Sequence, residues 1–422
     1  MPSSSVPTRF YIISDTHGET LPSSYLPTAS IKVDVAIHCG DLTDESKLSE
    51  FRTSLEMLKT ISAPLKLVIA GNHDFTLDIP MFKKKIAEVQ PPLSQDLVEE
   101  EYGCYGQVQD LFTAAKQEGI VFLDEGVHSF TLANGAKLTV YASPNTPSTN
   151  DWGFQYHPDE DHEWNIGNAD VVVTHGPPLG ILDRVDKRLG SVSLFHAIEK
   201  SRPLLHCFGH IHSNWGAKLM AWKNDIVDPT HFTAFDNDES STIHTLATLS
   251  PGKYDTPEIK EEKLSIYQAL EQTGSCTTSH CSSDSRLLRR GQDTLFVNAA
   301  MQGTLERPWQ LPWIVDLELP RTGPELPGAG TEKPEAAPVL PEATPVLTEV
   351  QPDTSESVLI SSEAGYVPPQ ASTDSLQDDL ILPQKSLPLP GALSQTGTRK
   401  RGRMTDEGPV KRQRLEERDG SD

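Results

Sequence analysis

The stretch FYIISDTHGE, residues 10–19, places an acid and an imidazole directly after a short apolar run. Phe10 to Ile13 are apolar and predict a buried strand. In an extended segment residues i and i+2 point to the same side, so Asp15 and His17 could hold one ion together, or each could reach a neighbouring ion. A strand that ends in this way predicts a metal-binding loop at one edge of a sheet.

Four further apolar runs end in the same manner, each at a potential metal ligand. They are Val33 to Cys39 before Asp41, Leu65 to Ala70 before Asn72, Val171 to Thr174 before His175, and Leu204 to Phe208 before His210 and His212. Amphipathic patterns over residues 44–59 and 107–118 predict helices between these runs. Strands that alternate with helices imply layered α/β packing, in which the carboxyl ends of the strands converge on one crevice.

The candidate ligands form a mixed set of nitrogen and oxygen donors. Asp41 has two carboxylate oxygens and could bridge two ions, whereas Asn72 offers a carbonyl oxygen and His175 an imidazole. Such a mixed set suits Mn, Fe or Zn better than Ca, and because it contains no thiolate it does not indicate a structural zinc site. Two divalent ions about 3.5–4 Å apart can clamp a phosphoryl group and lower the pKa of a bound water toward about 7. The expected nucleophile is therefore a metal-bridging hydroxide.

A proton donor is expected beside this metal site. The sequence contains no G-x-S-x-G elbow and no P-loop, so no serine or cysteine nucleophile stands out. His73 lies one residue beyond Asn72 and should point elsewhere, a position from which it could protonate the leaving oxygen. Asp74 is expected to orient His73 and to favour its protonated form. Other histidines, such as His38 and His206, are predicted to be packing or surface residues.

The composition changes near residue 320. Residues 321–422 are rich in proline and carry Tyr366 as their one aromatic residue, which predicts a disordered, acidic tail. The folded domain is expected over residues 8–320, with its last strands at TLFVNAA (294–300) and WIVDLEL (313–319). Residues 129–142 predict a hairpin that turns at Asn134-Gly135. The polar segment 223–290 predicts a surface insertion that is mostly mobile.

The net charge and the composition of the chain limit the classes of partner that are expected. The net charge of −24 argues against long nucleic acids as primary partners. MPSSSVPTRF is no signal peptide and no run of 18 apolar residues occurs, so a soluble, unsecreted protein without a membrane partner is expected. Five scattered cysteines suit a reducing compartment.

Two basic clusters lie near the C-terminus and resemble a two-part nuclear import signal, with a solvated charged end as an equal alternative. They consist of Arg399, Lys400, Arg401 and Arg403, and of Lys411, Arg412 and Arg414. The expected location is cytoplasmic, nuclear or both, with an import receptor as a candidate partner.

The blocks SDTHG, CGDLTD, AGNHDF, THGPP and GHIHSNWGA resemble the calcineurin-like metallophosphoesterase superfamily, whose pattern is D-x-H, G-D, G-N-H-D/E, H and G-H-x-H. The resemblance implies a four-layer αββα sandwich with two divalent metal ions, Mn foremost and Fe or Zn as alternatives. It implies that one ion is held by Asp15, His17, Asp41 and His212, that the other is held by Asp41, Asn72, His175 and His210, and that His73 is the catalytic acid.

Within that superfamily, the sequence more closely resembles metallophosphoesterase-domain-containing proteins of the brain-expressed type and their fungal relatives. The likeness rests on AGNHDFTLD, YASPNTPSTNDWGFQY, DVVVTHGPPLGILD and FVNAAMQ, and it covers residues 8 to about 222 and 291–320. It implies hydrolysis of small phosphodiesters, including cyclic nucleotides. Some members replace the first histidine of the last block and lose activity, whereas His210 is present here.

Two alternative functions remain at this stage. A protein serine/threonine phosphatase would carry an arginine-bearing signature after Gly-Asp and Arg before Gly-Asn-His-Glu, whereas Ala70 precedes Gly71 here. A weakly active regulatory or scaffolding protein would act through its tail. The aromatic residues Trp152, Phe154 and Tyr156 are expected either to wall a substrate cleft and stack on a base, or to anchor their loop to the core.

Overall fold

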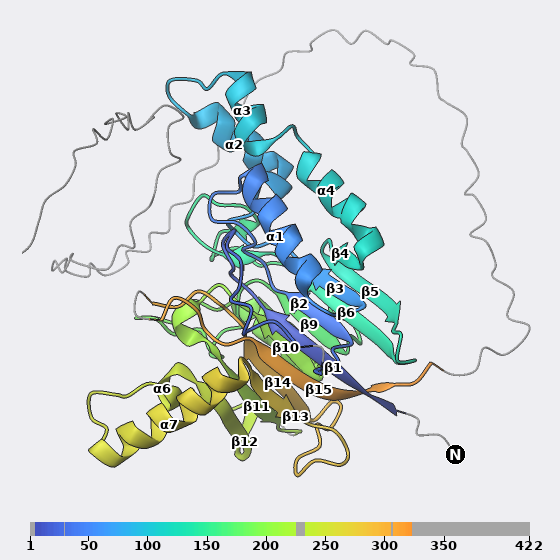
Figure 1. Cartoon of the computed structure of the whole chain (residues 1–422), viewed down its shortest axis with the longest axis vertical. Helices are drawn as coiled ribbons and strands as arrows, with labels where there is room; N and C mark the ends of the chain where they lie inside the picture. The colour runs from blue at the N-terminus through green and yellow to red at the C-terminus, as the bar shows by residue number, and fades with distance from the viewer. Residues whose placement is uncertain (1–4, 29, 225–232, 305–306, 323–422) are drawn as a thin grey trace, which may run out of the picture. The chain divides into compact units, whose positions relative to one another are not determined.

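Two β-sheets form the centre of the molecule (Figure 1). The computed structural model describes residues 5–28, 30–224, 233–304 and 307–322. In spatial order, the six-stranded sheet contains β13 (Cys276–Ser279), β15 (Trp313–Pro320), β1 (Ser5–Ile13), β2 (Val35–His38), β3 (Leu65–Val68) and β4 (Ile120–Phe122). The seven-stranded sheet contains β12 (Phe235–Thr245), β11 (Gly216–Trp222), β14 (Asp293–Asn298), β10 (Leu205–Phe208), β9 (Val171–Thr174), β6 (Lys137–Ser143) and β5 (Gly126–Thr131). A short pair, β7 (Thr146–Pro147) and β8 (Gln155–Tyr156), lies outside both sheets.

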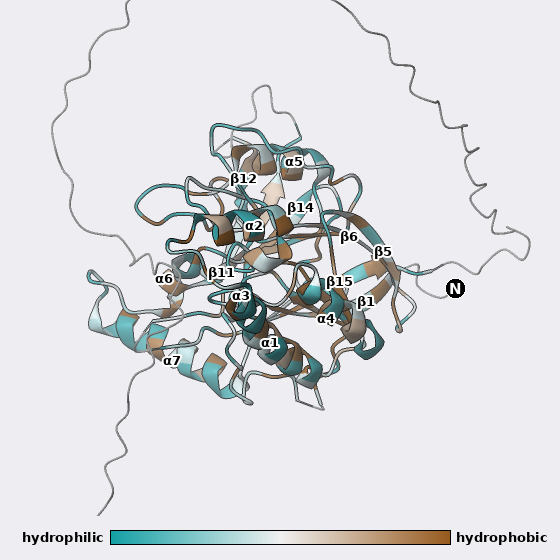
Figure 2. Cartoon of the chain, turned by 90° about the horizontal axis from the view of Figure 1, so that it is seen from above, coloured by the Kyte–Doolittle hydropathy of each residue, from teal (hydrophilic) through white to brown (hydrophobic). Residues whose placement is uncertain are grey.

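Helices cover the outer faces of the two sheets. Helices α1 (Leu48–Thr60) and α4 (Gln107–Ala115) lie over the six-stranded sheet, and α5 (Val192–Ser201) lies on the far side, over the seven-stranded sheet (Figure 2). The remaining helices are α2 (Ile79–Glu88), α3 (Gln95–Tyr102), α6 (Leu246–Leu249) and α7 (Pro257–Thr273), with 3₁₀ turns η1 (Phe75–Leu77), η2 (Lys116–Glu118) and η3 (His212–Asn214). No helix among the described residues is long and apolar enough to cross a membrane.

Strand β1 shows why the apolar runs are continuous rather than alternating. Phe10 and Ile12 pack between the two sheets, while Tyr11 and Ile13 pack on the other face against α1 and α4. In the same way Val171 of β9 faces the space between the sheets and Val172 faces α5. Strands buried on both faces need apolar residues at every position. The predicted αββα four-layer sandwich is confirmed by these three apolar layers.

The central strands bring their carboxyl ends to one edge. β1, β2 and β3 run parallel, as do β9, β10 and β14. Just beyond the strand ends, Ser14 of the first sheet forms a parallel bridge with Ala300 of the second, and Met301 N–H donates to Ser14 O at 2.8 Å. The loops that carry the predicted ligands therefore meet where the two sheets are joined. The predicted hairpin is also present, as β5 and β6 with its turn at Gly135.

The segment 223–290 differs from the expectation of a mostly mobile surface insertion. β12 pairs with β11 at the edge of the seven-stranded sheet, and β13 pairs with β15 at the edge of the six-stranded sheet. Between them lies α7, which is mainly hydrophilic (Figure 2). Most β12 side chains are exposed or half-buried. A polar composition is compatible with such an edge strand, so the polar sequence of this segment does not distinguish a strand from a mobile loop. From residue 323 on, the predicted tail, with its basic clusters, lies outside the described residues.

Candidate metal centre

The ligand loops adopt a backbone conformation that costs free energy. Asp15, His17, Asp41 and His210 have φ of 54°, 48°, 52° and 66°, in the left-handed region. Each such non-glycine residue costs about 1–2 kcal/mol. Strain of this kind concentrates at functional sites, where the surrounding structure enforces it. The chain turns sharply after each strand so that the side chain of the following residue points into the site.

Glycines beside the ligands allow the loops to approach one another. A Cβ at Gly71 would overlap the backbone nitrogen and Oδ1 of Asp41, and a Cβ at Gly209 would overlap Oδ2 of Asp15. Gly40 has φ of 96°, and a Cβ there would lie 2.5 Å from Ala70 O. The glycines in the Gly-Asp, Gly-Asn-His-Asp and Gly-His-x-His motifs are therefore required by contacts between neighbouring loops.

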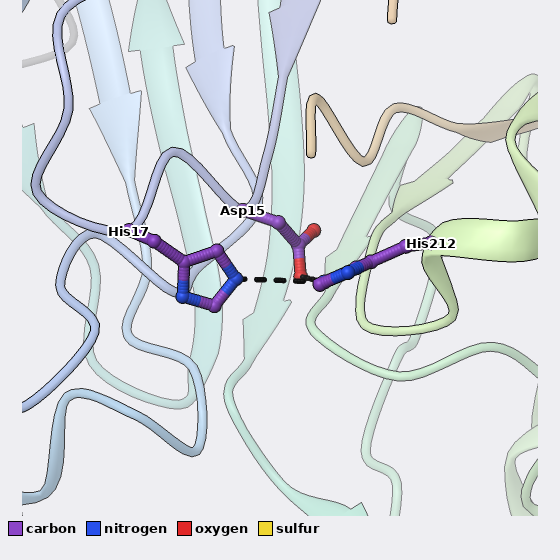
Figure 3. A group of neighbouring side chains, drawn as sticks. All are labelled: Asp15, His17 and His212. Carbon is purple, nitrogen blue, oxygen red and sulfur yellow. Dashed lines mark hydrogen bonds and ion pairs between the residues drawn. The ribbon is translucent and has the colours of Figure 1, made fainter. Parts of the chain in front are cut away.

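The first donor group consists of Asp15, His17 and His212, whose side chains point toward one another from the ends of β1 and β10 (Figure 3). His212 Nε2 lies 3.1 Å from Asp15 Oδ1 and 3.4 Å from His17 Nε2. Burial opposes ionisation of Asp15, but the hydrogen bond and charge of His212 outweigh it and hold the pKa of Asp15 well below its usual range. Burial lowers the pKa of His17.

The second donor group consists of Asp41, His175 and His210. His175 Nε2 lies 3.3 Å from Asp41 Oδ2 and 3.0 Å from Asn72 Oδ1, and its Nδ1 lies 2.9 Å from Cys39 O. Burial works against a charge on His175, and Asp41 outweighs it, raising the pKa of His175 to about 9. Burial lowers the pKa of His210 to about 3.

Asp41 lies between the two groups. Its Oδ2 is 3.3 Å from His175 Nε2 and 4.0 Å from His17 Nε2, while its Oδ1 accepts the backbone N–H of His73 at 2.9 Å. The sequence suggested that Asp41 could bridge two ions. In the structure its Oδ2 faces both groups, while its Oδ1 is held by the loop that carries His73.

The donor set fits divalent metal ions. Within each group the ligand atoms lie within 4.8 Å of one another, close to the largest separation, about 4.0–4.4 Å, of two donors that bind one ion at about 2.0–2.2 Å. His175 has the hydrogen-bond pattern of a metal ligand, since a bond from Nδ1–H to Cys39 O leaves the Nε2 lone pair for a cation. The seven predicted ligands Asp15, His17, Asp41, Asn72, His175, His210 and His212 are thus brought together, all on loops after β1, β2, β3, β9 and β10.

His73 lies beside this centre and is oriented by a residue that the sequence reading missed. Its Nδ1 is 2.6 Å from the carbonyl oxygen of Asp44 and 3.9 Å from Asp44 Oδ1. Because a carbonyl oxygen can only accept, Nδ1 carries the hydrogen of this bond, and Nε2 is the nitrogen available for other contacts. Asp44 stands three residues after Asp41, a spacing visible in the sequence. His73 also comes within 4.8 Å of donor atoms of His17 and Asp41.

Asp74 does not orient His73, contrary to the prediction. Its Oδ1 accepts from the backbone N–H and the hydroxyl of Thr43 at 3.0 and 2.7 Å. Its Oδ2 accepts from Gly71 N–H and Leu42 N–H at 2.8 and 3.1 Å. Burial and then the Asp41 charge raise the pKa of Asp74 to about 7, against these hydrogen bonds. Asp74 instead ties the Gly-Asp loop to the Gly-Asn-His-Asp loop.

Trp152, Phe154 and Tyr156, which follow β7, lie in three different environments. The Trp152 ring lies beside the His73 ring, with centroids 4.5 Å apart. Phe154 packs against the apolar cluster under α1 and α4, as an anchor of the loop would. The Tyr156 hydroxyl donates to Ser191 Oγ at 2.8 Å, and its ring stacks on His162. His38 and His206 are fully buried packing residues.

Comparison with known proteins agrees with this geometry. Residues 8–214 match the family model of the calcineurin-like phosphoesterases. The chain is 34% identical over 220 residues to metallophosphoesterase domain-containing protein 1 of Homo sapiens, a match that covers 50% of this chain and 62% of that protein. It is 30% identical over 222 residues to UPF0046 protein T07D4.2 of Caenorhabditis elegans, covering 49% and 52%.

A match to a probable rhamnogalacturonate lyase C of Emericella nidulans is 31% identical over 218 residues and covers 51% of this chain but 18% of that protein. The chain thus spans less than two thirds of the length of these relatives. Among solved structures, the protein TT1561 of Thermus thermophilus is similar with a TM-score of 0.30 and 13% identity, over 49% of this chain and 82% of that one.

Proposed function

Because residues 8–214 form a calcineurin-like phosphoesterase domain, we propose that this protein is a dinuclear, metal-dependent phosphodiesterase that hydrolyses small phosphodiesters such as cyclic nucleotides. The observation that carries the proposal is the position of Asp41, whose Oδ2 faces His17 on one side and His175 on the other. A carboxylate oxygen between two groups of histidine and aspartate donors is the arrangement that a pair of ions requires.

The residues around the site would have different roles in the reaction. Two divalent ions, Mn foremost, would supply a nucleophilic hydroxide near neutral pH and neutralise charge on the phosphoryl oxygens. Asp15, His17, His212 and Asp41 would hold one ion, and Asp41, Asn72, His175 and His210 the other. His73 would donate a proton from Nε2 to the leaving oxygen as its bond to phosphorus breaks. The net charge of −24 favours small esters over long polyanions as substrates.

The first test is hydrolysis by the full-length, metal-stripped protein after Mn²⁺ is added back. Substrates are bis(p-nitrophenyl) phosphate, cyclic nucleotides and a phosphopeptide. Asp41→Asn should abolish metal-dependent hydrolysis, whereas Asp110→Asn, on the exposed side of α4, should retain it. Hydrolysis of the phosphopeptide alone would favour the protein phosphatase. An inactive protein that binds metal would favour the regulatory function.

Location is a separate proposal, and it concerns residues outside those described. We propose that the basic clusters at 399–403 and 411–414 are read by an import receptor, so that the protein is found in the nucleus as well as the cytoplasm. Replacement of Lys411, Arg412 and Arg414 by alanine should shift a fluorescent fusion toward the cytoplasm. An unchanged nuclear signal would contradict this proposal.

A further inference from the structure

We propose that Trp152 is a positioning residue, which holds the His73 imidazole in the orientation that delivers a proton to the leaving oxygen. The inference rests on the proposed function, since it assigns a role within that reaction. The sequence suggested a different role for Trp152, as a wall on which a substrate base stacks. The contacts around the two rings favour the positioning role.

Three contacts hold the His73 ring, one at a nitrogen, one at a face and one at an edge. Its Nδ1 is 2.6 Å from Asp44 O. The Trp152 ring lies 4.5 Å away at an interplanar angle of 30°, so the indole covers a face of the imidazole. The His17 ring meets it edge-on, with centroids 4.9 Å apart and an angle of 90°. Because the ring cannot turn without losing these contacts, Nε2 keeps one direction.

The loop that carries Trp152 is tied to the segment that carries His73. Gly153 N–H donates to Asn72 O at 3.0 Å, and Phe154 N–H donates to Asp78 Oδ2 at 2.9 Å. A Cβ on Gly153 would lie 2.7 Å from the Cα of Phe75, so the two backbones are in direct contact. The indole and the imidazole are therefore held beside each other by hydrogen bonds to the backbone of Asn72 and to the side chain of Asp78, which lie on either side of His73 in the chain.

Trp152 is only partly exposed, because neighbouring side chains pack against its ring. The ammonium of Lys85 lies 4.7 Å from the Trp152 ring centroid, and the Phe75 ring lies 6.1 Å away. Burial lowers the pKa of Lys85, which agrees with a lysine held against aromatic rings. Trp152 is thus packed among His73, Phe75 and Lys85, as expected of a residue that supports the position of another.

The positioning role of Trp152 predicts that its effect on the rate depends on the leaving group. When the bond from phosphorus to the leaving oxygen breaks, the electron pair stays on that oxygen, and a proton from His73 Nε2 neutralises it. A p-nitrophenolate ion is stable without that proton, whereas the more basic phenolate is not. General acid catalysis is worth about 10²–10⁴ in rate where it is needed. Loss of a positioning residue should therefore harm the poor leaving group selectively.

The test compares methyl phenyl phosphate with methyl p-nitrophenyl phosphate as substrates for the full-length, Mn²⁺-loaded protein. Trp152→Ala should lower kcat/KM about 10- to 100-fold for the phenyl ester and less than about 3-fold for the p-nitrophenyl ester. Trp152→Phe, which keeps a ring, should recover most of the loss. Adding Trp152→Ala to His73→Ala should cause no further loss. Metal content, measured by elemental analysis, should equal that of the wild type.

Tyr105→Ala is the control, because it removes a more exposed aromatic ring that also lies under a lysine of α2, Lys83. It should leave both rates unchanged. An equal loss for both esters in Trp152→Ala, or the same loss in the His73→Ala background, would overturn the positioning role while leaving the proposed function standing. Failure of His73→Ala itself to discriminate between the two leaving groups would overturn both the positioning role and the assignment of His73.

Discussion

At the scale of single residues, Asp74 shows how a buried carboxylate can support a site without facing the donor groups. Each of its oxygens accepts two hydrogen bonds, and all four donors belong to Gly71, Leu42 and Thr43. An isosteric asparagine keeps one oxygen, which can accept two of these four hydrogen bonds. Its NH₂ group replaces the other oxygen and would face the remaining two donors. The Gly-Asp and Gly-Asn-His-Asp loops would then lose their shared anchor.

Asp74→Asn should therefore lower the free energy of unfolding by about 1–3 kcal/mol and reduce activity through displacement of both loops. Urea unfolding and a metal-binding assay measure the two effects. Thr43→Val removes one of the four bonds, that of the hydroxyl, and should cost about 1 kcal/mol. Wild-type stability in Asp74→Asn would contradict the anchoring role.

His206 provides a test of pH dependence that is independent of the metal ligands. Its Nε2 lies 2.8 Å from Thr174 Oγ1, whose own hydroxyl donates to Gly176 O, so Nε2 carries the hydrogen and the ring is neutral. Burial lowers the pKa of His206 to about 3. The unfolded chain takes up a proton near pH 6.5, whereas the folded chain does not, so stability is lost as the pH falls from about 6.5 toward about 3.

His206→Leu should remove this loss. Between pH 7.5 and pH 5 the wild type should lose about 2 kcal/mol more of its free energy of unfolding than the variant does. Urea unfolding at the two values gives the difference, and His196→Leu, at an exposed position on α5, should behave as the wild type does. The same loss in His206→Leu and the wild type would show that His206 is not buried as a neutral ring.

At the scale of elements, the turns after the strands govern the site. Gly209 follows β10, and a Cβ there would overlap Asp15 Oδ2 and Ser14 Oγ of the other sheet. Gly209→Ala should displace the Asp15 carboxylate and reduce the bound metal, as measured by elemental analysis. Gly291→Ala is the control, because its φ is +73° but its Cβ would meet nothing within 4 Å. It should cost about 1 kcal/mol of stability and keep its metal. Full metal content in Gly209→Ala would contradict this account.

The sequence predicts elements well where their pattern depends on local contacts. The apolar runs that end at Asp15, Asp41, Asn72, His175 and His210 all form central strands, because a strand buried on both faces must be apolar throughout. The edge strands β12 and β13 were not predicted. Their exposed faces tolerate polar residues, so no apolar pattern distinguishes them from loops.

At the scale of the whole molecule, the site exists only where the two sheets meet. Asp15, Asp41 and Asn72 extend from the six-stranded sheet, while His175 and His210 extend from the other. Bonds between the sheets fix their alignment, including His210 N–H to Asp15 Oδ1 at 3.0 Å and His175 Nδ1 to Cys39 O at 2.9 Å. Sequence patterns identify the ligands but not the docking of the sheets. The roles of Asp44 and Trp152 depend on that docking and on loop contacts, so they emerged only from the structure.

The central claim is that two donor groups, joined by Asp41, hold two ions that act together. The most direct test adds Mn²⁺ stepwise to the metal-free, full-length protein and measures both bound metal and hydrolysis of bis(p-nitrophenyl) phosphate at each step. Binding should saturate at two ions per chain, with activity that reaches its maximum only as the second ion binds, and Asp41→Asn should lose that activity. Full activity with one bound ion per chain, or in Asp41→Asn, would contradict the account.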